Sequence, residues 1–325
     1  MNIFDQIIEG YRIEDSEELL HILDTNSADT LYEGCHKVTR ALCGDGFDTC
    51  SIINVKSGKC PEDCQWCAQS AHYDTGCDTY GILSPETCAT HAKSNRDMGI
   101  KRFSLVASGR RPSRFDVQKY GEIYTHIGHK TDIHLCASLG LADEETLREL
   151  YTAGVTTYHC NLETAPSYFP KLCTTHTQDA KIETLKAARR VGMKACSGGI
   201  LGMGESRDQR VEFALLLHSL GIESIPLNFL HPIPGTPLGE HPIMSDEEML
   251  ETVVLIRLSN PTSFLRFAGG RKNFSDRAIR DALYVGINAA ITGDLLTTVA
   301  SETEQDMIMF AECGYDTSAP TDWSK

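Results

Sequence analysis

Short apolar runs alternate with longer amphipathic segments along most of the chain, and this alternation is typical of repeated strand–helix units. Eight apolar runs predict strands, near 50–55, 102–107, 132–137, 156–161, 194–197, 224–228, 263–267 and 288–292. Eight strands that are each followed by a helix predict an α/β fold, a (β/α)8 TIM-type barrel, in which chemistry lies at the carboxyl ends of the strands. An open doubly wound sheet is the alternative architecture.

The amphipathic segments begin with Ser, Thr or Asp, and several end at Gly, as helix caps require. The predicted helices of the barrel include 84–99, 142–154, 177–192, 206–221 and 245–259.

Two further helical patterns precede the first strand, with Asp15 and Ser27 as caps and Gly44 as a stop. They predict an N-terminal helical extension over residues 1–45. The barrel is expected over 46–300, and we expect the polar tail over 301–325 to be partly flexible.

Composition narrows the classes of function. The chain has 325 residues, and its 45 acidic against 30 basic residues give a net charge of -15, so most of the surface would repel a polyphosphate backbone. Nucleic acid is therefore not an expected partner. There is no apolar run long enough for a membrane span, and the acidic first residues do not resemble a secretion signal. We expect a cytoplasmic protein that has no membrane partner, whose thirteen cysteines stay reduced and available for metal.

Three cysteines stand close together in SGKCPEDCQWCAQS, immediately after the first predicted strand. Three thiolates from Cys60, Cys64 and Cys67 can bind three irons of a cubane cluster and leave the fourth iron open to a small molecule. The alternative is a zinc knuckle, which needs a fourth ligand, and His72 is the nearest candidate. Seven cysteines without recognisable spacing are expected to act as small buried hydrophobes: Cys35, Cys43, Cys50, Cys77, Cys88, Cys173 and Cys313.

This loop after a first barrel strand resembles the signature of the radical S-adenosylmethionine (SAM) superfamily. The resemblance implies a [4Fe-4S] cluster that passes an electron to SAM, releasing methionine and a 5'-deoxyadenosyl radical that takes hydrogen from an unactivated carbon. Trp66 stands where the superfamily places an aromatic side chain near the adenine, although simple packing explains it equally well.

Within the superfamily, five stretches in order resemble the biotin synthase family from about Ile53 to Thr298: SGKCPEDCQWCAQS, YHCNLET, KACSGGILGMGES, NFLHPIPGTPL and FLRFAGGR. The resemblance implies that Asn161 and Glu163 bind substrate and the SAM ribose, and that Asn228 contacts the ureido ring of dethiobiotin. Lys181 stands where the family commonly has an arginine facing the SAM carboxylate, and a lysine keeps the charge but loses the fork geometry. Each of these polar residues is alternatively a strand-end or turn group.

The family carries an auxiliary cluster inside the barrel, usually [2Fe-2S] held by three cysteines and an arginine. Cys136, Cys196 and Arg266 match three of these ligands, whereas Ser104 occupies the position of the remaining cysteine. Cys160 stands where many family members have histidine. We hypothesise that Cys136, Cys160 and Cys196 hold a [4Fe-4S]-type cluster whose open iron carries the extra sulfide, with [2Fe-2S] as the alternative.

Two of these assignments leave alternatives. Because side chains alternate along a strand, Cys160 should point away from Asn161 and Glu163, and without a bend it is a buried bystander. Arg266 is a metal ligand or only a charge partner of anionic sulfide, since arginine almost never deprotonates.

The sequence leaves three alternative functions. The first is radical insertion of sulfur into dethiobiotin, which consumes two SAM per biotin and uses the auxiliary cluster as sulfur donor. The second is a related radical SAM enzyme acting on an amino acid, like methylornithine synthase or a hydrogenase maturase, which needs no sulfur donor. The third is a non-catalytic iron–sulfur carrier, which would not cleave SAM. For the first, the resemblance implies a homodimer and a small electron donor such as flavodoxin or ferredoxin.

Overall fold

The computed structural model describes residues 1–293 and 303–321. Its core is a barrel of eight parallel strands: β1 (Asp48–Lys56), β2 (Arg102–Ala107), β3 (His134–Ser138), β4 (Val155–His159), β5 (Lys194–Cys196), β7 (Ser224–Phe229), β8 (Phe264–Phe267) and β9 (Ala289–Ile291). β9 pairs with β1, and a contact between Cys196 and Ser224 joins β5 to β7 and closes the ring. The predicted TIM-type barrel is confirmed, and closure rules out the open sheet.

The short strand β6 (Gly199–Leu201) continues from β5 along β7. Side chains alternate between the barrel interior and the surrounding helices, as the pleat requires. On β2, Arg102 and Ser104 line the interior cavity, whereas Phe103 and Leu105 are fully buried on the outer face. This alternation decides which strand residues can take part in chemistry.

The five predicted barrel helices are confirmed as α4 (Pro85–Asp97), α6 (Glu144–Thr152), α7 (Gln178–Val191), α8 (Arg207–Ser219) and α9 (Asp246–Ser259). The sequence interpretation missed α5 (Arg114–Gly128), α10 (Asp276–Val285) and the short 3-10 turns η1 (Phe169–Lys171) and η2 (Arg271–Asn273). Caps marked the two missed helices: Ser113 forms a capping box with Asp116, and the Ser275 side chain caps α10.

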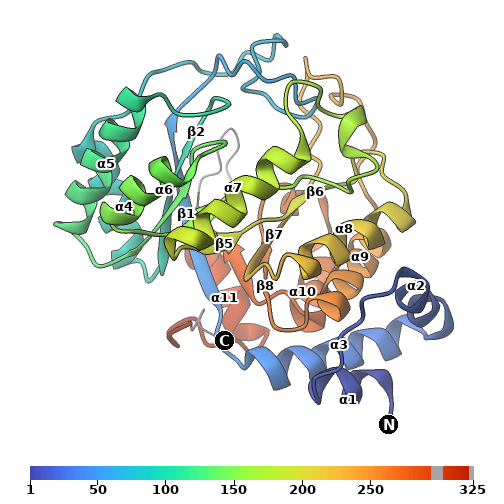
Figure 1. The fold of residues 1–325 in the computed structure, drawn as a ribbon. Coiled ribbons are helices and arrows are strands. Elements are labelled where there is room, and N and C mark those ends of the chain that lie inside the picture. Colours follow the sequence, from blue (N-terminus) through green and yellow to red (C-terminus); the bar gives the residue numbers. More distant parts are fainter. Residues whose placement is uncertain (294–302, 322–325) are drawn as a thin grey trace.

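The N-terminal extension consists of α1 (Ile3–Ile8), α2 (Ser16–Thr25) and α3 (Ala28–Cys43), and it packs against the α8–α10 side of the barrel (Figure 1). Asp15 and Ser27 cap α2 and α3, and Gly44 follows α3 with a φ of 74°, as the sequence predicts. Thr39 Oγ1 donates to the Val285 carbonyl at 3.3 Å. The extension therefore adds to the barrel's core, and its division from the barrel at residue 45 stays a prediction.

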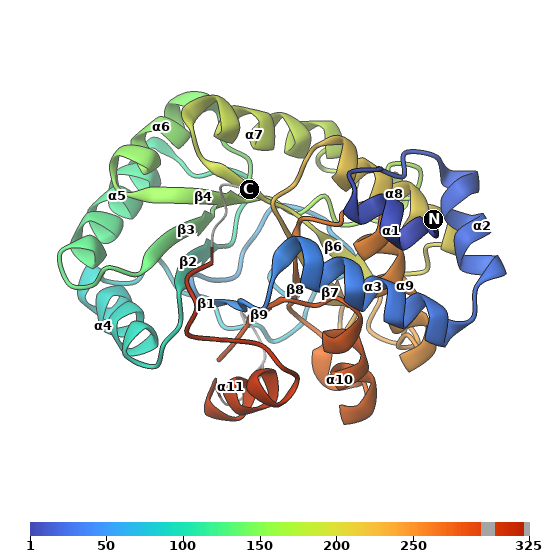
Figure 2. The same cartoon turned by 90° about the horizontal axis from the view of Figure 1, so that it is seen from below.

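The predicted tail contains a packed helix, α11 (Thr303–Glu312), which lies beside α10 on the outside of the barrel (Figure 2). Phe310 is fully buried and stacks on Phe47 with ring centroids 4.0 Å apart. Residues 294–302 and 322–325 lie outside the described part of the chain. Among the described residues, no helix has both the length and the apolar character needed to span a bilayer.

Candidate active site

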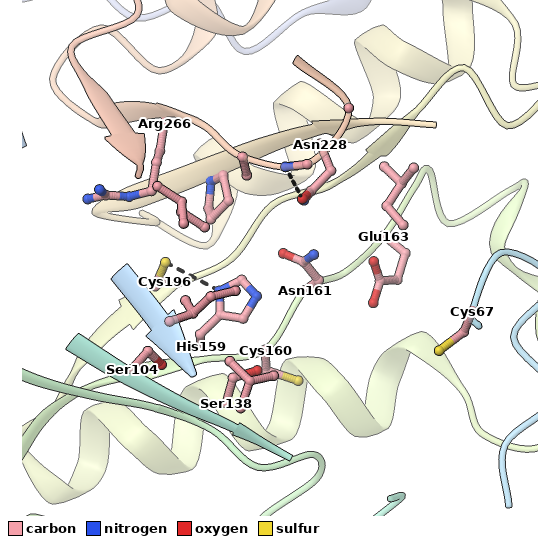
Figure 3. Close-up of a pocket in the computed structure, with 18 of the residues that line it drawn as sticks. Cys67, Ser104, Ser138, His159, Cys160, Asn161, Glu163, Cys196, Asn228 and Arg266 are labelled. Carbon is pink, nitrogen blue, oxygen red and sulfur yellow. Dashed lines mark hydrogen bonds between the residues drawn. The ribbon is translucent and has the colours of Figure 1, made fainter. Parts of the chain in front are cut away.

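A cavity of about 430 Å³ occupies the barrel and opens towards the loops at the carboxyl ends of the strands. Cys67 lies at its outer end and Cys196 at its inner end, with Asn161 and Glu163 between them (Figure 3). The predicted residues that line this cavity are Trp66, Cys67, Cys136, Cys160, Asn161, Glu163, Lys181, Cys196, Asn228 and Arg266. One cavity therefore reaches from Cys67 of the cysteine loop to the inner group of predicted cluster ligands.

The three-cysteine loop is closed at its base by backbone hydrogen bonds. Cys60 N donates to the Gln69 carbonyl at 2.9 Å, and Ala71 N donates to the Cys60 carbonyl at 2.7 Å. Cys67 N donates to the Cys64 carbonyl at 3.1 Å, which forms a tight turn between these two cysteines. The loop therefore holds its cysteines in a compact arrangement that its own backbone fixes.

A fourth thiol lies beside this loop, and the sequence interpretation missed it. Cys173 Sγ is 3.7 Å from Cys64 Sγ and 3.3 Å from His176 Nδ1, and one ligand atom from each of the three residues lies within 4.8 Å of the others. The Cys-x-x-His spacing of Cys173 and His176 was an available signal. His72 is not part of this trio, because its Nε2 lies 3.0 Å from the Pro61 carbonyl.

Glu163 and Lys181 form a buried ion pair, with Lys181 Nζ 3.1 Å from Glu163 Oε1. Burial lowers the pKa of Lys181, but Glu163 together with the nearby Cys160 and Cys64 outweighs burial, and the pKa is raised. Glu163 has a φ of 72°, which is rare for a residue other than glycine, and its Oε2 is buried with no hydrogen-bond partner. A strained backbone and an unpaired carboxylate oxygen in a cavity both indicate a ligand contact.

The glycine pair of KACSGG makes room for this strand end. A Cβ on Gly198 would lie 1.9 Å from the Pro226 carbonyl oxygen, and one on Gly199 would lie 2.2 Å from that of Glu163. Only glycine allows these close approaches. The motif therefore fixes the position of Glu163.

Asn161 and Asn228 are held by backbone groups of neighbouring strand ends. Asn161 Oδ1 accepts from Gly198 N at 3.0 Å, Asn228 Nδ2 donates to the Gly199 carbonyl at 3.0 Å, and Asn228 Oδ1 accepts from Gly269 N at 2.9 Å. Both amides are thus oriented in the cavity wall (Figure 3). Their predicted roles towards substrate and SAM stay predictions.

Trp66 lines the outer part of the cavity and packs against a small apolar cluster of Leu172, Met203 and Leu230. Trp66 therefore does pack against neighbouring side chains. Because it also lines the cavity, its contact with the adenine of SAM stays a prediction.

At the inner end, the structure brings together Cys136 and Cys196 and adds Cys50, which the sequence interpretation had treated as a small hydrophobe. The neighbouring Cys136 thiol raises the pKa of Cys50, and all three cysteines are buried in the cavity wall. Cys196 Sγ lies 3.3 Å from His159 Nδ1. Ser104 also lines this end of the cavity.

Cys160 is placed differently. It follows the last residue of β4, and its thiol points away from Cys196 (Figure 3). Burial raises the pKa of Cys160 to about 11, and the charged groups that act on it are Lys181 and Glu163, towards the outer end. The structure does not bring its thiol to Cys136 and Cys196, and its role as a cluster ligand stays a prediction.

Arg266 is held at the inner end by a buried carboxylate. Arg266 and Arg102 both pair with Asp48, and Arg266 Nη1 also donates to the Ala290 carbonyl at 3.1 Å. Burial would raise the pKa of Asp48, but the two guanidinium groups hold it below its usual value. This geometry is that of a charge partner, and ligation of metal by Arg266 stays a prediction.

Comparisons with known proteins agree with this site. The family model "Radical SAM superfamily" matches residues 54–217, and the model "Biotin and Thiamin Synthesis associated domain" matches residues 226–316. A curated biotin synthase of Porphyromonas gingivalis is 57% identical over 94% of this chain and 93% of its own length. The biotin synthase of Parabacteroides distasonis is 48% identical over 98% and 97%.

Solved structures share the fold. The crystal structure of methylornithine synthase covers 99% of this chain and 98% of its own, with a TM-score of 0.84 and 17% identity. That of HydG, a maturase of the [FeFe]-hydrogenase, covers 96% and 74%, with a TM-score of 0.81 and 15% identity. At such low identity these likenesses establish the barrel fold alone.

The barrel, the cysteine loop and the family models define this chain as an enzyme of the radical SAM superfamily, which implies a [4Fe-4S] cluster and SAM. Within that superfamily, the chain belongs to the biotin synthase family. The residues present fit the implied groups: three thiols lie on one closed loop, and Glu163 Oε2 is a buried acceptor without a partner.

Proposed function

We propose that this enzyme inserts sulfur into dethiobiotin to form biotin, using SAM and an auxiliary iron–sulfur cluster as sulfur donor. One observation carries the proposal: a single cavity has cluster-type thiols at both ends, with polar side chains between them. A radical enzyme that rearranges or cleaves an amino acid needs only the outer group. The inner thiols therefore favour sulfur insertion over the alternative.

Cys60, Cys64 and Cys67 would hold the SAM cluster. When bound, that cluster supplies the electron that splits SAM reductively. Lys181 supplies positive charge near the outer end, while the unpaired Oε2 of Glu163 is available to a hydroxyl donor such as the SAM ribose.

Asn161 and Asn228 present amide edges to the middle of the cavity, where the ureido group of dethiobiotin would lie. Because the backbone fixes both amides, they orient substrate without first losing side-chain freedom. The substrate would thus lie between the two ends of the cavity, within reach of both.

Cys136 and Cys196 would hold the auxiliary cluster at the inner end. We favour a [4Fe-4S]-type cluster with an extra sulfide, and a [2Fe-2S] cluster is the alternative. Arg266 would stabilise the anionic sulfide by its charge, since Asp48 holds the guanidinium in its protonated form.

Further partners follow from the chemistry. Reductive cleavage of SAM requires a small electron donor, of the flavodoxin or ferredoxin type. All thirteen cysteines are free thiols, which favours action in the reducing cytoplasm, and we propose that the enzyme acts there as a homodimer.

An anaerobic assay with dethiobiotin, SAM and a reductant tests the function by mass detection of biotin. We expect biotin, and we expect dethiobiotin to stimulate 5'-deoxyadenosine release more than lysine does. Release that responds to lysine and yields no biotin would favour the amino-acid alternative. No release with either compound would contradict both.

A further inference from the structure

We infer that Cys50 is a ligand of the auxiliary cluster, together with Cys136 and Cys196, in the position predicted for Cys160. The inference rests on the proposed auxiliary cluster and names its donor set. Neither the family resemblance nor the spacing of cysteines along the chain identifies Cys50 as a ligand. The position of Cys50 in the barrel identifies it.

The strand register puts these side chains at one height. The hydrogen-bonded ladder leads from Cys50 across β2 to His134, and Cys136 is two residues farther along β3. In a TIM-type barrel the strands are staggered by about eight residues in total, so side chains on alternate strands are level after a shift of two residues. The same step, two strands across the ladder and two residues along the strand reached, leads from Cys136 to Cys196 and from Cys196 to Arg266. It also leads from Arg266 back to Cys50.

These four residues therefore form one interior layer, to which every second strand contributes one side chain. The burial of these residues agrees with the register. All four side chains line the cavity with at most 9% exposure, so they share one buried space at the inner end of the barrel. A layer of three thiols and one cation is a ready donor set for an iron–sulfur cluster.

Cys160 cannot join this layer. Cys160 follows β4, which lies between the strands of Cys136 and Cys196 and contributes no side chain to this layer. Its thiol points away from Cys196 (Figure 3). The charged groups that act on the Cys160 thiol are Lys181 and Glu163, at the outer end of the cavity.

The charges of the inner end match such a cluster. Arg102 and Arg266 contribute two positive charges, and Asp48 contributes one negative charge, so the protein supplies a net positive charge in a buried site. A dicationic iron–sulfur core held by three thiolates carries one net negative charge, and the extra sulfide of the favoured cluster makes the charge more negative. Burying the negative cluster without the arginines, or the arginines without a negative partner, would cost free energy.

An unsatisfied hydroxyl lies next to the layer. Thr157 Oγ1 is buried in the cavity wall without a hydrogen-bond partner, and Thr157 is paired with Cys136 in the strand ladder. A bridging sulfide or thiolate would accept its proton, and hydrogen bonds of this kind tune the cluster. This observation is independent of the cysteines.

Iron and acid-labile sulfide counts test the donor set without reference to activity. In a variant with Cys60, Cys64 and Cys67 all changed to alanine, the iron that remains belongs to the barrel. We expect Cys50→Ala in this background to lower iron and sulfide at least about fivefold, because a three-thiolate set loses one ligand. Cys160→Ala and the matched buried control Cys35→Ala should leave both counts unchanged.

Cys50→Ser guards against a variant that simply fails to fold. In the same background, with the circular dichroism spectrum retained, its Mössbauer spectrum should show an altered iron site, whereas Cys160→Ser should leave the spectrum unchanged. Full iron and an unchanged spectrum in the Cys50 variants would overturn the inference, as would loss of iron in Cys160→Ala. If the wild-type protein binds iron in this layer but makes no biotin, the proposed function is contradicted and the inference about Cys50 is not.

Discussion

The outer loop and the inner layer of the barrel both gather three thiols, but they do so in different ways. Cys60, Cys64 and Cys67 lie within eight residues of sequence, and backbone hydrogen bonds inside the loop fix their arrangement. Cys50, Cys136 and Cys196 come from strands far apart in sequence, and only barrel closure makes them neighbours.

The surroundings of the two groups differ as well. The loop cysteines are half-buried and have Cys173 and His176 at their side, whereas the inner cysteines are buried beside Arg266, Arg102 and Asp48. A half-buried cluster suits exchange of electrons and SAM, and a buried one suits a sulfur atom that must react with substrate rather than water. Five predictions test this contrast.

The largest effect is expected in the loop. Cys64→Ala removes one of three ligands, so SAM can no longer be split, and 5'-deoxyadenosine formation should fall at least about 1,000-fold in an anaerobic chromatographic assay. Cys35→Ala, a buried thiol in α3, should keep wild-type release. Substantial release by Cys64→Ala would mean that Cys173 replaces the missing thiolate.

In the inner layer, Asp48→Asn should destabilise the protein by about 3–5 kcal/mol, because two buried guanidinium groups lose their counter-charge. Urea unfolding followed by circular dichroism under anaerobic conditions measures this change. Asp132→Asn, which breaks an exposed pair with Arg96, serves as the control and should have a far smaller effect.

The Asp48 effect should also depend on pH. The pKa of Asp48 is lowered by folding, so its contribution to stability is complete above its unfolded value of about 4 and is lost as the pH falls through the folded value. The difference between wild type and Asp48→Asn should stay constant from pH 5 to 7 and shrink below about pH 4. A difference that grows on acidification would contradict the pairing.

Between the two regions, Glu163→Gln should weaken SAM binding about tenfold, since it removes a charged acceptor and leaves Lys181 unpaired. Anaerobic equilibrium dialysis with labelled SAM measures the change. Glu183→Gln, an exposed residue of α7, the helix that carries Lys181, is the matched control. Equal affinities of Glu163→Gln and wild type would remove Glu163 from the SAM site.

The smallest effect is expected for Cys173→Ala. If the three loop thiolates suffice, the iron content and the SAM-dependent change in the electron paramagnetic resonance spectrum should alter by less than about twofold. Loss of the loop cluster in this variant would show that Cys173 is a required ligand. The contrast between a local loop site and an assembled inner site would then be weaker.

The sequence predicted the barrel because strand–helix alternation and helix caps are local patterns. Asp15, Ser27 and Gly44 act as predicted, while α5 and α10 were missed although Ser113 and Ser275 carry the same signal. The tail was expected to be polar and partly flexible, and its packed helix α11 was not foreseen, because the burial of Phe310 depends on Phe47, which is distant in sequence.

For the site, sequence alone determined what lies within one segment: the cysteine loop, and the glycines that let a strand end approach its neighbour. Tertiary structure decided the inner layer, since strand stagger sets which interior residues are level and the pleat sets which face inward. A cysteine without ligand spacing, Cys50, therefore meets Cys136, whereas Cys160 lies in a family motif but faces away. Spacing along the chain identifies residues that are neighbours within one loop. Only the strand register of the closed barrel identifies residues that are neighbours across the barrel interior.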